Sequence, residues 1–278
     1  GTAGPVIDAL KLKLEEKGLN PNFFYLHHDL DPSFPNGIPN PLLLENQSVT
    51  SDFVIKKKAD MGVAFDGDFD RCFFFDHHGN FIPGEYLVGL FAEVFLRNEA
   101  GAPIIHDPRV IWNTLDVVGK GGGQAIVSRT GHAYVKAAMR ASGAIYGGEI
   151  SAHHYFRDFS YCDSGMIPWL LVWELLSNSK LSLADLIADR KKRFPSSGEM
   201  NFTVSTATDC ILQIKQMYSP IAISIDELDG LSMSFKDWRF NLRKSNTEPL
   251  VRLNVETKGD KELLKEKTEE LIGLIIHA

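Results

Sequence analysis

The chain has 278 residues and a formal net charge of −7, with 44% hydrophobic and 23% charged residues. This composition is typical of a folded globular protein, and the acidic balance excludes a general nucleic-acid binder, which needs a basic surface. The three cysteines are far apart and form no CxxC pair, which excludes a disulfide framework and a zinc ribbon and favours a reducing compartment. We find no signal peptide and no apolar run near the ~20 residues of a membrane span. We therefore predict a cytoplasmic protein without nucleic-acid or membrane partners.

The first part of the sequence predicts an incomplete α/β domain. The chain runs from Gly1 straight into an amphipathic helix over 6–17, with no initiator Met and no preceding strand, so we expect that it is truncated. The apolar segment Phe23–Leu26 predicts a short buried strand, and four prolines in 31–41 predict a loop. A helix over 45–58 and strands over 61–65 and 72–75 follow.

The middle of the sequence alternates between strands and helices at the spacing of right-handed crossovers, which predicts a largely parallel sheet. Here we expect strands at 104–105, 125–127 and 144–146 and helices at 84–97, 112–120, 132–141, 164–178 and 182–190. After Phe194–Gly198 the regular alternation of predicted strands and helices ends. The last part predicts strands at 200–206, 221–225, 231–235, 238–242 and 250–256 and helices at 208–217 and 260–276.

The predicted fold class is therefore α/β: mixed or parallel three-layer αβα domains, one of them incomplete, followed by an α+β domain with an antiparallel sheet. We expect the domains to cover residues 1–81, 82–195 and 196–278.

The sharpest chemical signal is the acidic turn after the strand over 61–65. Asp66, Asp68 and Asp70 place three carboxylates at alternate positions, and Arg71 follows them. Clustered like charges repel unless a cation neutralises them, and carboxylate oxygens suit Mg²⁺ better than zinc. An EF-hand does not fit, because its sixth position would be Arg71 and its twelfth His77. We interpret the turn as a magnesium site, with a plain acidic surface turn as the alternative.

Four further polar loops are candidate binding segments. In Gly147–His154, Glu149 and Ser151 can bind sugar hydroxyls and His153 can move a proton; the alternative is a loop with solvated histidines. Ser128–His132 precedes a helix, a position suited to anions, although His132 alone is as often structural. Arg109 alone is more often a surface residue. Arg243–Pro249 combines cations, hydroxyls and an amide suited to phosphate, or is a generic basic turn.

Taken together, these loops resemble the α-D-phosphohexomutase family, in motif order and over the whole chain. Asp66–Arg71 resembles the family's DGDxDR metal loop, Gly148–His153 its sugar-binding GEMS-type loop and Arg243–Pro249 its RxSNTEP phosphate loop. Thr130–His132 resembles its TGH segment, and Phe34–Pro41 resembles the FPN..PNP run before the metal loop. The family's N-terminal domain, which carries a phosphoserine, has no counterpart here.

The resemblance implies that a phosphoserine of the missing N-terminal domain exchanges its phosphoryl group with a hexose phosphate through a hexose bisphosphate. The continuation after Ser151 looks like the mannomutase branch, which implies interconversion of mannose 6-phosphate and mannose 1-phosphate for GDP-mannose and surface polysaccharides. Dual mannose and glucose specificity remains an alternative. The implied roles are Mg²⁺ binding by Asp66, Asp68 and Asp70, catalysis by Arg71, His132 and His153, and substrate binding by Arg109, Glu149, Ser151, Arg243, Ser245, Asn246 and Thr247.

Two other function classes remain to be weighed. A haloacid-dehalogenase-type phosphatase also places aspartates after a strand, but Phe69-Asp70-Arg71 does not continue its DxDx[TV] motif and the RxSNTEP-like loop would be unexplained. A non-catalytic module could bind phosphosugar and Mg²⁺ without the serine. We expect the isolated chain to have no mutase turnover.

Overall fold

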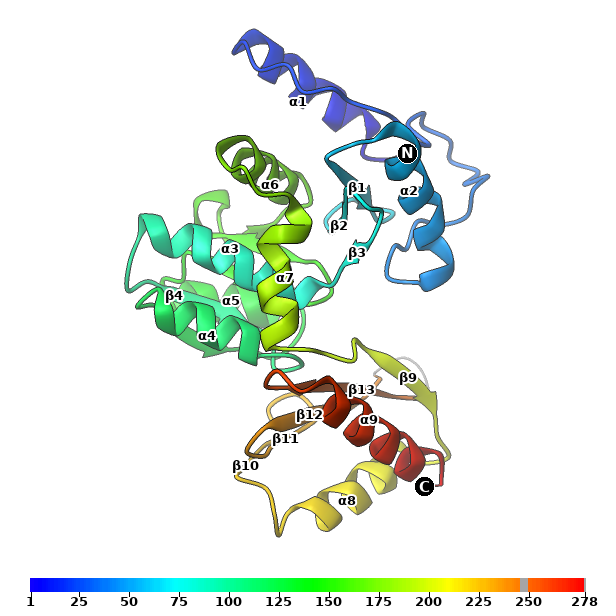
Figure 1. Ribbon diagram of the computed structural model, residues 1–278, viewed down its shortest axis with the longest axis vertical. Coiled ribbons are helices and arrows are strands. Elements are labelled where there is room, and N and C mark those ends of the chain that lie inside the picture. The colour runs from blue at the N-terminus through cyan, green and yellow to red at the C-terminus, as the bar shows by residue number, and fades with distance from the viewer. Residues whose placement is uncertain (246–249, 278) are drawn as a thin grey trace. The chain divides into compact units, whose positions relative to one another are not determined.

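The structure, a computed structural model, describes residues 1–245 and 250–277. Its packing divides the chain into two compact units, one formed by residues 1–84 and 151–186 and the other by residues 85–150 and 187 onwards (Figure 1). Within the described residues, no helix is both long enough and apolar enough to span a membrane.

The first unit is built around a small antiparallel sheet. Its strands β1 (Met61–Phe65), β2 (Cys72–Asp76) and β3 (Phe81–Ile82) lie in the order β1-β2-β3. Every residue of β2 is buried, and its Phe73, Phe74 and Phe75 are at most 1% exposed, so this strand forms the core of the unit. The remaining elements are α1 (Gly4–Glu16), α2 (Leu44–Lys57), β7 (His154–Phe156), the 3₁₀ turn η1 (Arg157–Phe159), β8 (Cys162–Asp163) and α6 (Met166–Asn178).

The second unit contains the predicted parallel strands. The strands β4 (Pro103–His106), β5 (Gln124–Val127) and β6 (Tyr146–Gly148) pair in parallel, with β4 in the middle. The helix α3 (Gly84–Asn98) precedes β4. The helices α4 (Trp112–Lys120) and α5 (His132–Ser142) separate the three strands along the chain, as the alternation of the sequence predicts. The helix α7 (Leu183–Arg193) follows α6 and ends in this unit.

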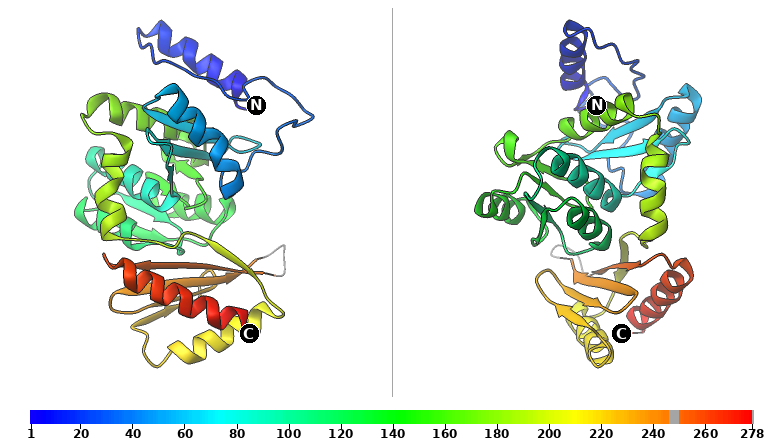
Figure 2. Two further views of the ribbon diagram at one scale, coloured as in Figure 1. Left: turned by 45° about the vertical axis from the view of Figure 1, so that its right-hand side comes forward. Right: turned by 60° about the vertical axis from the view of Figure 1, so that its left-hand side comes forward.

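The C-terminal part of the second unit is the predicted α+β fold. Its antiparallel sheet has the order β10-β11-β12-β13-β9, and α8 and α9 pack on the same face of it (Figure 2). Both helices contribute to one apolar core, which includes the stacked rings of Phe235 and Trp238. The elements are β9 (Met200–Thr203), α8 (Ala207–Tyr218), β10 (Ser224–Asp226), β11 (Leu231–Ser234), β12 (Trp238–Lys244), β13 (Leu250–Thr257) and α9 (Lys261–Ile276).

The fold class is therefore confirmed, but two strand predictions are wrong in detail. Phe23–Leu26 is not a strand: it is irregular, and Phe24 is 48% exposed. A strand needs a hydrogen-bonded neighbour, and none of the described strands pairs with this segment. The strand expected at 144–146 lies at Tyr146–Gly148, because pairing with Ile104–His106 sets its register.

Candidate functional site

The acidic turn connects β1 to β2 in the first unit. Both carboxylate oxygens of Asp66 accept hydrogen bonds from Arg71, one from its backbone N–H at 3.2 Å and the other from Nε at 2.5 Å. Asp66 is only 2% exposed, whereas Asp68 is exposed. One oxygen from each of Asp66, Asp68 and Asp70 lies within 4.8 Å of the others, so the turn gathers three carboxylates at the end of an apolar strand.

The carboxylates of this turn carry negative charge that a divalent cation would neutralise. Burial raises the pKa of Asp70, His153 opposes that rise, and the carboxylates of Asp66, Asp68 and Asp163 add to it. Each carboxylate keeps oxygen lone pairs besides those used by Arg71. An all-oxygen set with unbalanced negative charge fits Mg²⁺, so the residues present are suited to the metal that the sequence implies.

The second half of the predicted sugar-binding loop lies beside this turn in the same unit. His153 forms an isolated antiparallel bridge with Arg71, and its Nε2 lies 3.6 Å from Asp70 Oδ1. The hydroxyl of Ser151 lies 3.3 Å from His153 Nδ1. The first unit thus brings Asp66, Asp68, Asp70, Arg71, Ser151 and His153 together.

The other half of the loop is anchored in the second unit. Glu149 is 1% exposed, and its Oε1 accepts a hydrogen bond from Gly131 N at 2.6 Å, which joins the predicted sugar-binding loop to the TGH segment. His132 is the first residue of α5 and is exposed. Asp107 Oδ2 accepts from Ile150 N at 2.8 Å and so holds the same loop from the end of β4.

The expectation that Arg109 lies on the surface is wrong. Arg109 is 3% exposed, and its Nη2 donates to Asp107 Oδ2 at 2.7 Å. Burial opposes ionisation of Asp107, but the guanidinium of Arg109 and the hydrogen bonds to the carboxylate keep the pKa of Asp107 below its ordinary value. A charge buried at this depth needs a partner, and here the partner follows directly from the Asp-Pro-Arg spacing.

The predicted phosphate loop starts inside a strand. Arg243 is the sixth residue of β12 and lies opposite Arg252 of β13, while Ser245 N donates to Leu250 O at 2.9 Å. The pairing of β12 with β13 therefore continues to Ser245 and Leu250. Asn246 and Thr247, which the sequence also assigns to this loop, lie outside the described residues.

Glu199 is the functional candidate that the sequence analysis missed. Its Oε2 accepts from Arg109 Nη1 at 3.2 Å and from Arg243 Nη2 at 3.1 Å, and its Oε1 accepts from Arg252 Nη1 at 3.4 Å. Glu199 precedes β9 and belongs to no motif of the resemblance. Only the pairing of β9 with β13 brings it among the arginines.

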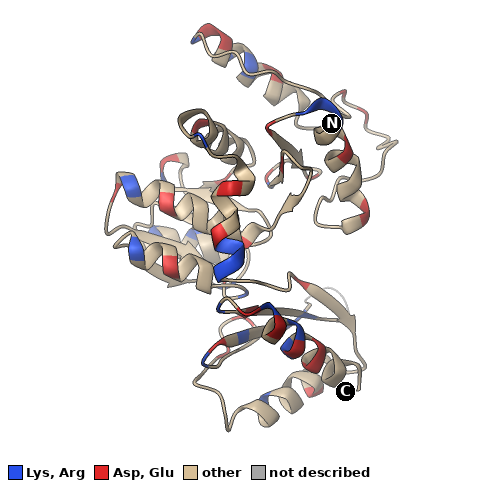
Figure 3. Ribbon diagram, viewed as in Figure 1, with Lys and Arg blue, Asp and Glu red and all other residues tan. Residues whose placement is uncertain are grey.

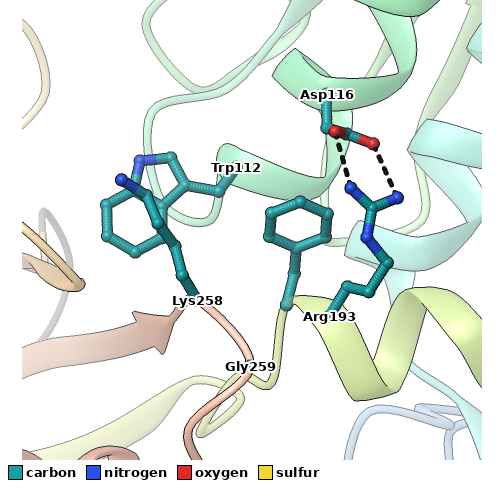
Figure 4. A pocket seen from close by; sticks show the side chains of 6 residues that line it. Trp112, Asp116, Arg193, Lys258 and Gly259 are labelled. Carbon is teal, nitrogen blue, oxygen red and sulfur yellow. Dashed lines mark hydrogen bonds and ion pairs between the residues drawn. The ribbon is translucent and has the colours of Figure 1, made fainter.

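A separate shallow pocket lies where α4, α7 and the turn after β13 meet, and none of its residues is a predicted site residue (Figure 4). Lys258 lies over the ring of Trp112 at 4.7 Å from its centroid. Arg190 and Arg193 both donate to Asp116; burial opposes ionisation of this carboxyl, but those hydrogen bonds and that of Lys120 hold the pKa of Asp116 at about 2. The basic end of α7 is visible in Figure 3.

Comparisons with known proteins cover all parts of the chain. Residues 1–79, 83–194 and 199–273 match the Phosphoglucomutase/phosphomannomutase alpha/beta/alpha domain II, alpha/beta/alpha domain III and C-terminal domain, respectively. The phosphomannomutases of Escherichia coli and Vibrio cholerae are each 56% identical, over 275 and 276 residues, which is 99% of this chain and 60% of each relative.

The fold is also similar to that of solved structures. A phosphoglucomutase/phosphomannomutase family protein from Burkholderia thailandensis matches with a TM-score of 0.81 and 30% identity, over 99% of this chain and 58% of that one. The chain thus spans about three fifths of the length of the relatives that it matches. Because the three domain matches follow one another along nearly the whole sequence, the chain belongs to the phosphoglucomutase/phosphomannomutase family.

Proposed function

We propose that this chain supplies the metal, sugar and phosphate loops of a phosphomannomutase that interconverts mannose 6-phosphate and mannose 1-phosphate. The observation that carries the proposal is the acidic turn, where Asp66, Asp68 and Asp70 converge and Arg71 fixes the buried carboxylate. The identity to relatives named phosphomannomutase supports the choice of sugar. The product would supply GDP-mannose for surface polysaccharides.

The phosphoryl donor would be a phosphoserine from the N-terminal part of the relatives that lies outside this chain. A sugar hydroxyl attacks its phosphorus, the bond from phosphorus to the serine oxygen breaks, and the hydroxyl proton passes to a base, for which His153 and His132 are the candidates. The hexose bisphosphate then turns over and returns its other phosphoryl group to the serine.

The residues of this chain would position the metal ion, the sugar and its phosphate groups for that reaction. Mg²⁺, held by Asp66, Asp68 and Asp70, supplies positive charge that stabilises the transferring phosphoryl oxygens. Arg71 lies against the turn and adds a cation there. We propose that Glu149 and Ser151 contact the sugar hydroxyls, and that Arg109 also contributes to substrate binding. The proposed contacts to the distal phosphate are Arg243, Ser245, Asn246 and Thr247.

The test is a chimera that joins this chain to the N-terminal part of the E. coli phosphomannomutase. We expect the chimera to convert mannose 1-phosphate to mannose 6-phosphate in a coupled assay and the isolated chain to show no turnover. Asp68→Asn in the chimera should lower kcat/KM by about 100-fold or more, because it removes one anionic metal ligand. Asp60→Asn, an exposed carboxylate just before β1, is the matched control and should leave activity unchanged.

Two results would contradict the proposal. One is a folded chimera without mutase activity, and the other is an Asp68→Asn chimera as active as its parent. If the chimera instead converts glucose 1-phosphate as efficiently as mannose 1-phosphate, the alternative of dual specificity holds.

A further inference from the structure

Glu199 forms ion pairs with Arg109 and Arg243, the two arginines that the proposed function assigns to substrate binding. Arg243 and Arg252 face each other across neighbouring strands, and like charges at directly opposed positions destabilise a sheet. Glu199 lies between them, with one carboxylate oxygen toward each arginine. Its negative charge therefore offsets a repulsion that the strand pairing itself creates.

The same carboxylate also restrains Arg109. Arg109 Nη1 and Arg243 Nη2 donate to a single oxygen of Glu199, at 3.2 and 3.1 Å. Burial opposes ionisation of Glu199, but Arg109 and Arg243 keep the pKa of its carboxyl below the ordinary value, so it is an anion at neutral pH. Two cations with proposed roles in substrate binding are thus fixed by one internal anion.

The charge of this cluster is not balanced by Glu199 alone. Three guanidinium groups surround one carboxylate, and Asp107 neutralises one of them through Arg109. Arg243 Nε is buried and has no hydrogen-bond partner within residues 1–245 and 250–277. The side chain of Arg243 is 14% exposed, and a phosphate bound to its guanidinium group would be repelled by Glu199, whose Oε2 lies 3.1 Å from Arg243 Nη2.

We propose that Glu199 is a positioning residue: it fixes the guanidinium group of Arg243 and lowers the affinity of the Arg243 site for phosphate. This inference rests on the proposed function, in which Arg243 anchors the distal phosphate. A lower affinity of the Arg243 site for phosphate benefits a mutase. Its bisphosphate intermediate must release the phosphate bound at this site before the sugar can reverse its orientation. Without Glu199, Arg243 and Arg252 would lose the carboxylate that they share, and the site would hold the phosphate too tightly.

The test is phosphate binding by the isolated chain, measured by calorimetry with inorganic phosphate and with mannose 1-phosphate. Glu199→Gln should tighten phosphate binding by about five- to tenfold, because a repulsive charge close to the anion is lost. Glu199→Asp keeps the charge but moves it away from Arg243, so it should tighten binding by about two- to threefold. Asp189→Asn removes an exposed carboxylate of the second unit and should leave the affinity within twofold of the parent.

The outcomes separate this inference from the proposed function. Disruption of the site would weaken phosphate binding, so tighter binding cannot result from disruption. If Glu199→Gln does not fold, the phosphate affinity of Glu199→Asp is compared with that of the parent instead. The inference is overturned if the Glu199 variants bind phosphate no more tightly than Asp189→Asn while Arg243→Gln abolishes binding. If the parent shows no saturable phosphate binding and Arg243→Gln changes nothing, the proposed role of the loop fails.

Discussion

Single residues in this protein show how burial alters chemistry that the sequence leaves ambiguous. His153 and His154 are neighbours in the chain, but His154 is the first residue of β7 and is fully buried, whereas His153 lies at the acidic turn. Burial and the adjacent His153 lower the pKa of His154 to about 3. The two histidines therefore have different roles, one structural and one a candidate for proton transfer.

This difference predicts a pH dependence of stability. Below the ordinary histidine pKa of about 6.5, the unfolded chain binds a proton at residue 154 that the folded chain does not, so stability falls as the pH falls. Between pH 7.5 and pH 5 this one group should account for about 2 kcal/mol of unfolding free energy.

Urea unfolding of the parent and of His154→Gln at both pH values checks the prediction. The difference between the two proteins at pH 7.5 gives the loss of packing, and the variant should lose less stability than the parent on going to pH 5. Equal losses would show that His154 titrates alike in the folded and unfolded states.

At the scale of elements, each candidate loop is held by a neighbouring segment rather than by its own strand alone. The acidic turn lies against the segment before α6, where Gly165 approaches its backbone. A Cβ at Gly165 would lie 2.4 Å from Phe69 O and 3.0 Å from Arg71 O, so no larger residue fits unless the turn moves. The left-handed φ of 52° at Phe69 indicates how sharply the chain turns here.

We therefore expect Gly165→Ala to weaken Mg²⁺ binding by about 10- to 100-fold, the range usual for residues that orient metal ligands. Calorimetric titration with Mg²⁺ measures the effect. Gly119→Ala is the matched control, because a Cβ at this position in α4 meets nothing within 4 Å. That variant should bind Mg²⁺ like the parent and gain about 0.5–1 kcal/mol of stability. Unchanged Mg²⁺ affinity in Gly165→Ala would mean that the turn does not depend on this contact.

At the scale of the second unit, a buried ion pair joins the parallel strands to the C-terminal sheet. Arg239 and Glu256 are 2% and 1% exposed, and Arg239 Nη1 donates to Glu256 Oε1 at 2.8 Å. Arg239 also donates to the backbone carbonyls of Pro108 and Arg109, while Glu256 accepts from the backbone N–H groups of Ile111 and Trp112. The segment that carries Arg109 is thereby fixed to β12 and β13.

Removal of one partner should uncouple these parts. Arg239→Ala leaves a buried carboxylate without its cation, so we expect a loss of about 3–5 kcal/mol in unfolding free energy. The double variant Arg239→Met/Glu256→Leu removes both charges and should recover part of that loss. The recovery is incomplete because the N–H groups of Ile111 and Trp112 lose their acceptor and the carbonyls of Pro108 and Arg109 lose their donor. Chemical denaturation measures both. A single variant as stable as the parent would show that the pair contributes little to the unit.

The sequence by itself determined most of the elements and indicated the kind of chemistry to propose. The pattern of apolar residues predicted the bounds of α4 and the parallel pairing of β4 with β5. The acidic turn after β1 indicated a cation site, because three neighbouring carboxylates repel one another and a cation removes that repulsion. These features are local, so a short stretch of sequence carries them.

Only the tertiary structure decided which charges meet. Glu199 belongs to no motif, because strand pairing and not the local sequence places it among three arginines, one of which is the buried Arg109. The apolar Phe23–Leu26 segment is irregular because none of the strands that the structure describes pairs with it. Contacts between residues distant in the chain depend on packing, which no local pattern of residues records.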